Sequence, residues 1–168
     1  MAIKKSSSDI QISAGLAETA ANTFTQLEVD LSLSPLDNEV FVVTAVDLDI
    51  DPPDAITATN TQTKAYVSTT SLTSAQGIDN SNVLTASKKD IRAAGFGDGG
   101  VAFDQQGLTA PEGMTGIIGI IATNNFFVGV QGNNNLVAKR ANARVYGYRA
   151  RADAATYAAL VQSEVLSS

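Results

Sequence analysis

The chain has 168 residues, a net charge of −6, and 44% hydrophobic but only 17% charged residues, a composition typical of one folded domain and not of a disordered chain. It contains no Cys, His or Trp, which excludes disulfides, Cys or His zinc sites, thiol nucleophiles and triads with an imidazole base. We therefore expect that it is not an enzyme. The acidic balance argues against direct nucleic-acid binding, and no apolar run is long enough to span a membrane.

Residues 1–22 are small and polar, with scattered apolar residues and no sustained period. This pattern predicts a flexible N-terminal arm that becomes ordered only against a neighbouring molecule. A single β-sandwich domain is expected to follow over residues 23–168.

The chain after residue 23 has the alternation of half-buried strands. Apolar and polar side chains alternate over residues 27–34, and Pro35 with the following turn ends this strand. A second strand over 40–50 begins apolar on both faces and ends with acidic residues on one face, before Pro52 and Pro53. Further strands are predicted over residues 61–72, 101–103, 115–123, 125–131 and 143–152.

Two helices are predicted among these strands. Ser87 and Asp90 have capping-box spacing and Gly95 can close a helix, which predicts a short internal helix over residues 87–95. Asp153 is positioned to cap a C-terminal helix in which Tyr157, Leu160, Val161 and Val165 form an apolar stripe. We expect this stripe to pack on the domain's own sheet.

Many short strands with frequent turns favour a mainly β fold with two antiparallel sheets in a sandwich. A jelly roll is the preferred topology, with one short internal helix and a C-terminal helix. An immunoglobulin-like sandwich is the alternative, although the Cys and Trp that mark many such domains are absent.

Three acidic residues form a candidate metal site. Asp47, Asp49 and Asp51 alternate along the second strand, so their carboxylates share one face, and oxygen ligands suit calcium. The helix-loop-helix calcium pattern is not met, because Pro52 stands where its glycine would be. A solvated strand face whose acids discourage edge pairing explains the same residues without any metal.

A basic group lies near the C-terminus and is a candidate contact with a neighbouring molecule. Its members are Lys139, Arg140, Arg144, Arg149 and Arg151. Residues 1–86 have 11 acidic and 3 basic side chains, whereas residues 87–168 have 6 and 8. This split is compatible with copies that meet acidic face to basic face and that associate less strongly at high salt. An ordinary strand surface is the alternative interpretation.

Four segments carry a resemblance to a known group of proteins: the polar residues 1–22, the Thr-rich segment 61–70, the glycine-rich loop 95–100, and the closing strand and helix start at 144–153. Together they resemble virion structural proteins, in particular single jelly-roll capsid coat or capsid-decorating proteins of bacterial or archaeal viruses. The resemblance implies a subunit that self-associates into, or decorates, a viral shell and that contacts other copies of itself and other capsid proteins.

The resemblance also implies a place in the virion and assembly in the host cytoplasm, with no cofactor. The alternative function is a calcium-dependent carbohydrate-binding β-sandwich module, with the ion held by Asp47, Asp49 and Asp51.

Overall fold

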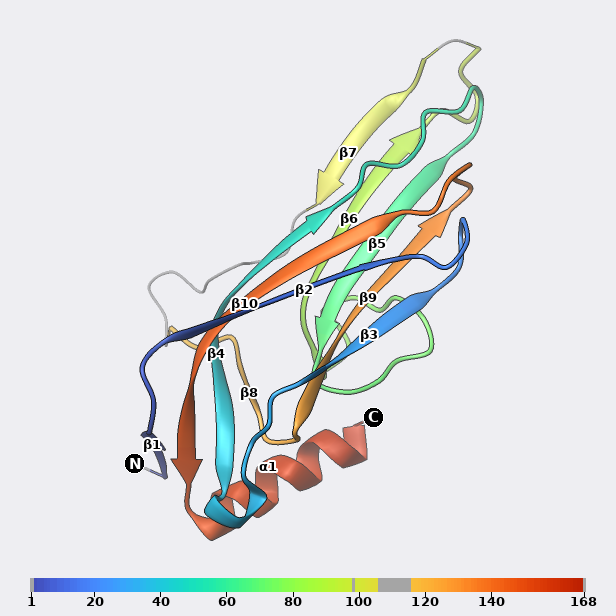
Figure 1. Cartoon of the computed structure of the whole chain (residues 1–168). Coiled ribbons are helices and arrows are strands. Elements are labelled where there is room, and N and C mark those ends of the chain that lie inside the picture. Colours follow the sequence, from blue (N-terminus) through green and yellow to red (C-terminus); the bar gives the residue numbers. More distant parts are fainter. Residues whose placement is uncertain (1, 98, 106–115, 168) are drawn as a thin grey trace.

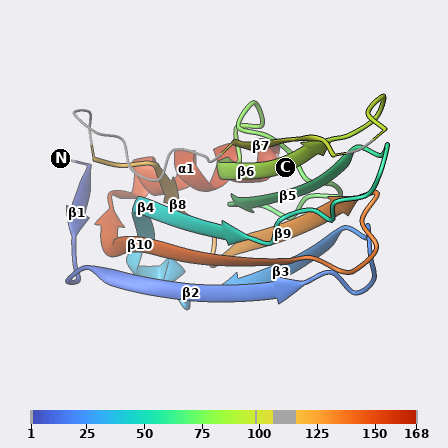
Figure 2. The same ribbon diagram turned by 90° about the horizontal axis from the view of Figure 1, so that it is seen from above.

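The computed structural model describes residues 2–97, 99–105 and 116–167, which form two antiparallel sheets and one helix (Figure 1). Figure 1 shows the helix at one end of the two sheets, and Figure 2 shows the strands from above with the helix behind them. The elements are β1 (Ile3–Lys5), β2 (Ile10–Ala17), β3 (Thr25–Asp30), the 3-10 turn η1 (Pro35–Asp37), β4 (Glu39–Ile50), β5 (Thr61–Ser68), β6 (Val83–Arg92), β7 (Val101–Gln105), β8 (Gly119–Ile121), β9 (Asn125–Asn133), β10 (Arg140–Ala152) and α1 (Ala154–Ser167).

The strand pairing is that of a jelly roll. Sheet A has the order β2-β10-β4-β8, with β1 paired to the last residues of β10, and sheet B has the order β3-β9-β5-β6-β7. The pairs β2/β10, β3/β9, β4/β8 and β5/β6 are nested, as though one long hairpin were wrapped around a barrel. This nesting confirms the jelly-roll sandwich, and the immunoglobulin-like alternative is wrong.

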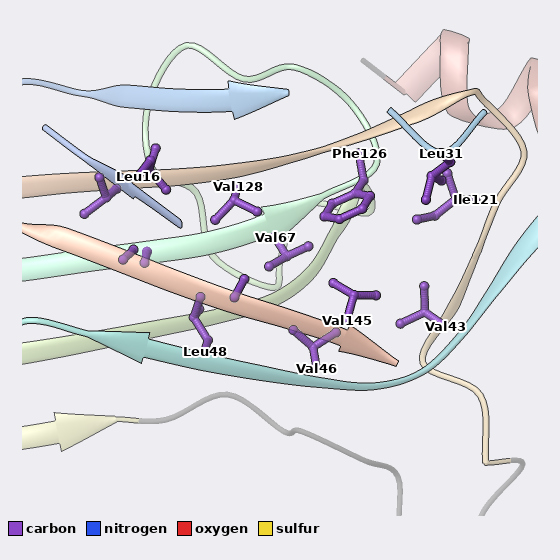
Figure 3. Close-up of a cluster of buried hydrophobic side chains, with 14 of the residues drawn as sticks. Leu16, Leu31, Val43, Val46, Leu48, Val67, Ile121, Phe126, Val128 and Val145 are labelled. Carbon is purple, nitrogen blue, oxygen red and sulfur yellow. The ribbon is translucent and has the colours of Figure 1, made fainter. Parts of the chain in front are cut away.

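The main core lies between the two sheets (Figure 3). Val46 and Leu48 of β4 and Val145 of β10 point from sheet A toward Val67 of β5 and Val128 of β9 in sheet B. The alternate residues of β4 face outward, as the two-residue period of a strand requires. The sequence pattern of residues 40–50 therefore predicted the strand, but not the irregularity at Thr44 through which Phe41 and Val43 share the core face with Val46 and Leu48.

Residues 3–17 differ from the predicted arm, because the structure places β1 and β2 within sheet A. All eight residues of β2 pair with β10, from Ile10 opposite Gly147 to Ala17 opposite Arg140. Small side chains weakened the apolar pattern, since only Ile10, Ile12 and Leu16 of this strand are large and apolar. That the segment is ordered only against a neighbour remains a prediction.

The predicted internal helix over residues 87–95 is wrong. Residues 83–92 form β6, which pairs with β5 on one side and β7 on the other. The capping-box spacing is a local signal, and two strand neighbours that satisfy the backbone of β6 outweigh it. Gly95 does take a left-handed conformation, with φ of +89°, but in a turn after the strand.

The C-terminal helix begins and packs as predicted. The Asp153 carboxylate accepts a hydrogen bond of 2.8 Å from the Thr156 amide, which is an N-cap. Tyr157, Leu160 and Val161 pack against a second apolar cluster on the outer face of sheet A, formed by Val40, Val42, Ala122, Ala150 and Ala152. Val165 of the predicted stripe is exposed. Among the residues that the structure describes, no helix is long and apolar enough to cross a membrane.

Candidate subunit-contact surfaces

The acidic and basic halves of the chain meet inside one subunit. β4 and β10 are neighbours in sheet A, with Asp47 directly opposite Arg144. The Asp51 carboxylate accepts a hydrogen bond of 3.0 Å from the Arg140 amide. Much of the charge split seen in the sequence is therefore balanced between adjacent strands, and not only between copies.

Two of the predicted interface residues are held within the subunit. Lys139 is buried and its Nζ lies 2.6 Å from Asp54 Oδ1. Arg149 forms an ion pair of 3.1 Å with Glu39 and donates to the carbonyl oxygens of Leu31 and Ser32. Both side chains stabilise connections between elements of their own subunit.

The other three predicted interface residues are more open to solvent. Arg140 and Arg144 are exposed on the outer face of sheet A, and Arg144 Nε donates a hydrogen bond of 3.3 Å to the Ser13 hydroxyl. Arg151 is exposed and lies 3.9 Å from Asp37. The predicted contact between copies, and its dependence on salt, thus falls on Arg140, Arg144 and Arg151.

Asp47 and Asp49 are exposed on the outer face of β4 and Asp51 directly follows the strand, but the structure does not bring the three carboxylates together. Successive residues on one face of a strand are about 6.6 Å apart. Asp47 Oδ2 accepts from the Tyr146 hydroxyl at 3.3 Å, and Asp51 binds the Arg140 amide. Across residues 2–97, 99–105 and 116–167, no three acidic side chains are grouped closely enough to hold a metal ion.

Several loops meet at one end of the sandwich, which we call the loop end: residues 18–24, 51–60 and 134–139. Asn135 is buried at its centre. The backbone N–H and C=O of Asn135 form hydrogen bonds with the side chain of Asn22 at 2.7 and 2.9 Å. The side-chain Oδ1 of Asn135 accepts from the Asp54 backbone amide, and its Nδ2 donates to the Gln62 carbonyl, both at 2.9 Å. One residue, through its backbone and its side chain, thus ties three loops and a strand together.

Charged groups complete this frame. Asp54 Oδ2 accepts from the amides of Leu136 and Val137 at 2.8 and 3.2 Å. The hydrogen bond from Lys139 holds the pKa of Asp54 below its ordinary value of 3.8, these two amides add to the effect, and burial opposes it. The buried carboxylate of Glu18 accepts from the amides of Gly132 and Lys139. The backbone of residues 132–139 is consequently held by the side chains of Glu18 and Asp54.

This rigid loop presents two large apolar side chains to solvent. Leu136 is 75% exposed and Val137 is 56% exposed; we call this pair the apolar tip. Exposed apolar residues are common singly, but an adjacent pair on a backbone fixed by buried polar groups is preorganised for contact.

The opposite end of the sandwich has a comparable frame. Glu164 of α1 is buried, and its two carboxylate oxygens accept hydrogen bonds of 2.7 and 3.0 Å from the amides of Ala122 and Thr123. These amides lie in the turn between β8 and β9, so the helix is fixed to the sandwich by a charged side chain. Val165 and Leu166 remain exposed beside it.

Sequence reasoning missed the residues that organise both ends. The side chains of Asn135, Asp54, Glu18 and Glu164 all accept hydrogen bonds from backbone amides far away in the sequence. The only sequence signal was local: three consecutive Asn residues before two apolar ones, which indicated a turn but not its partners.

No family model and no curated protein matches the chain. Among solved structures, the unassembled VP1 pentamer of Merkel cell polyomavirus is similar over 88% of this chain and 98% of that chain, at 7% identity and a TM-score of 0.42. The VP1 pentamer of human polyomavirus 6 is similar over 86% and 95%, at 9% identity and 0.42. The structure of Desmodium yellow mottle tymovirus is similar over 84% and 87%, at 10% identity and 0.31. The jelly-roll assignment for this chain rests on its strand pairing.

Proposed function

We propose that this protein is a structural shell subunit, a capsid coat or capsid-decorating protein of a virus, that works by repeated self-association. The observation that carries the proposal is the apolar tip: polar side chains beneath the loop hold its backbone, while the side chains of Leu136 and Val137 face solvent. The exposure of Leu136 and Val137 adds nothing to the stability of a monomer, whereas an interface uses such rigid apolar anchors.

The fold agrees with this proposal but does not decide it, since jelly rolls serve viral capsids, lectins and other proteins. The composition favours the shell subunit over a catalyst, because the chain has neither His nor Cys. A bacterial or archaeal host, contact with other capsid proteins, presence in the virion and assembly in the host cytoplasm belong to the same proposal.

Calcium-dependent carbohydrate binding is the weaker alternative. It needs oxygen ligands that converge on one ion, and Asp47, Asp49 and Asp51 are spread along β4 with two of them bound to β10. A module of this kind would be a small oligomer that binds sugar only with calcium present. A shell subunit would form large particles or bind a preformed capsid, whether or not a chelator is added.

The proposal is tested by removing the apolar tip. The double variant Leu136→Ser, Val137→Ser should keep the wild-type unfolding midpoint, because both side chains are exposed, but should lose particles in negative-stain microscopy and sedimentation velocity. Ile78→Ser is a matched control, since Ile78 is also 75% exposed and lies in a different loop. Particles that form as readily in the double variant as in the control would contradict the proposed role of the tip.

A further inference from the structure

β2 forms an unprotected sheet edge. The other described edge strands are either charged or short: β3 contains Glu28 and Asp30, β7 contains Asp104, β1 contains two lysines, and β8 has three residues. β2 has eight residues, with the sequence IQISAGLA, and no charge or proline. Proteins usually block long edges with charge, proline or a bulge, because an open edge pairs with another chain. Figure 2 shows β2 at the margin of sheet A, with β10 on its inner side.

The direction of the β2 backbone groups follows from two contacts. The Glu18 amide donates to the Lys139 carbonyl at 2.9 Å, so residue 18 faces β10. The Arg140 carbonyl accepts from the backbone amide of Asp51, which lies on the other side of β10, next to the end of β4. Ala17, which is paired with Arg140, therefore makes no backbone hydrogen bond to β10. Because antiparallel ladders alternate, the N–H and C=O groups of Gln11, Ser13, Gly15 and Ala17 point away from the sheet.

These four residues match a second copy of themselves. In an antiparallel pair centred on Ala14, Gln11 lies opposite the partner's Ala17 and Ser13 lies opposite the partner's Gly15, each pair exchanging two hydrogen bonds. Shifting the pair by two residues in either direction leaves one outward-facing residue of each copy without a match. The centred register is therefore the one that satisfies the whole edge.

The side chains also fit this register. On the inner face, Ile12 lies opposite the partner's Leu16, and Ala14 lies opposite the partner's Ala14. Ile12 and Ala14 are only partly buried against the main core in the single subunit. The outer face brings together the uncharged residues Gln11, Ser13, Gly15 and Ala17, so no like charges oppose each other in the strand.

We infer that two copies of this protein pair along β2 about a two-fold axis at Ala14, which continues sheet A from one subunit into the next. The inference rests on the proposed function, because it names one contact through which subunits associate. One strand pair buries little area, so we expect the isolated contact to be weak and to depend on protein concentration.

The chain lacks cysteine, so one introduced thiol reports the register. In the proposed pair the two copies of residue 14 form a non-hydrogen-bonded pair with Cα atoms about 4.5 Å apart, within the range that a disulfide spans. Ala14→Cys should form an intermolecular disulfide under mild oxidation. The matched control Ala17→Cys should remain reduced, because that residue lies opposite the partner's Gln11.

A second variant tests the edge without a thiol. Ser13→Pro removes an N–H that points away from β10, so the ladder within the subunit keeps its bonds. It should weaken dimerisation in sedimentation velocity about tenfold or more, through loss of central hydrogen bonds and a clash of the ring. Its unfolding midpoint should stay near that of the wild type.

The outcomes separate this contact from the proposed function. In one outcome, particles form, Ala14→Cys gives no disulfide, and Ser13→Pro assembles like wild type. That outcome would overturn the β2 pairing and leave the shell role intact. A specific disulfide at residue 14 in a protein that never exceeds a dimer would support the pairing and contradict the shell role. Equal cross-linking of Ala14→Cys and Ala17→Cys would show random collision and would also overturn the register.

Discussion

Replacing Glu164 by Ala should weaken the attachment of the C-terminal helix to the sandwich. The two carboxylate oxygens accept bonds from the amides of Ala122 and Thr123, and Glu164 is only 7% exposed. Each hydrogen bond to a charged group contributes about 1.5–3 kcal/mol. Thr123 is half-buried, so water partly replaces its bond, and we expect a total loss of about 3 kcal/mol in the free energy of unfolding.

Urea unfolding followed by circular dichroism measures this loss. Glu164→Gln keeps one acceptor oxygen and should lose about half as much. Gln162→Ala, an exposed change on the same helix, should stay within about 0.5 kcal/mol of wild type. If Glu164→Ala is no more destabilising than Gln162→Ala, the carboxylate does not hold the helix and the assignment of this contact is wrong.

Three other predictions concern stability and mobility. Leu160→Ala should cost about 1–2 kcal/mol in chemical unfolding, since Leu160 is only half-buried; a cost near zero would place α1 off the sheet. Asp54 has a lowered pKa, so the stabilisation that its charged form provides is complete above its ordinary pKa of 3.8 and is lost as pH falls through the lower folded value. Asp54→Asn should therefore be less stable than wild type at pH 7, and its stability should depend less on pH in the acidic range. An acid transition identical to that of the wild type would refute this. The amides of Gln11, Ser13 and Gly15 should exchange with deuterium rapidly in the free subunit and slowly in the assembly; strong protection in the monomer would show that they already have partners.

The sequence predicted most strands because their signal is local. Strands were predicted over residues 40–50, 61–72 and 143–152 from apolar runs and alternation, which is weaker in 61–72, and the structure has strands over 39–50, 61–68 and 140–152. The start of α1 could also be predicted from a local signal, since the side chain of Asp153 caps the helix that follows it. The segment of β6 was mistaken for a helix because the pairing with β5 and β7 that makes it a strand involves other segments of the chain. A local sequence pattern does not show such pairing.

The candidate contact surfaces were predictable only in part. Arg140, Arg144 and Arg151 are exposed as a contact requires, whereas Lys139 and Arg149 bind Asp54 and Glu39 of their own subunit. Which acid meets which base depends on β4 lying beside β10, and strand order is not encoded in periodicity. The apolar tip depends similarly on Asn135, whose partners lie 73 to 113 residues away.

The mass distribution of the purified wild-type protein tests self-association most directly. Sedimentation velocity over a wide concentration range, with negative-stain microscopy of the same samples, should show monomers at low concentration that give way to dimers and then to large, regular particles, with no effect of a chelator. A protein that stays a monomer or small oligomer at every concentration, and that binds no preformed capsid, would contradict the account.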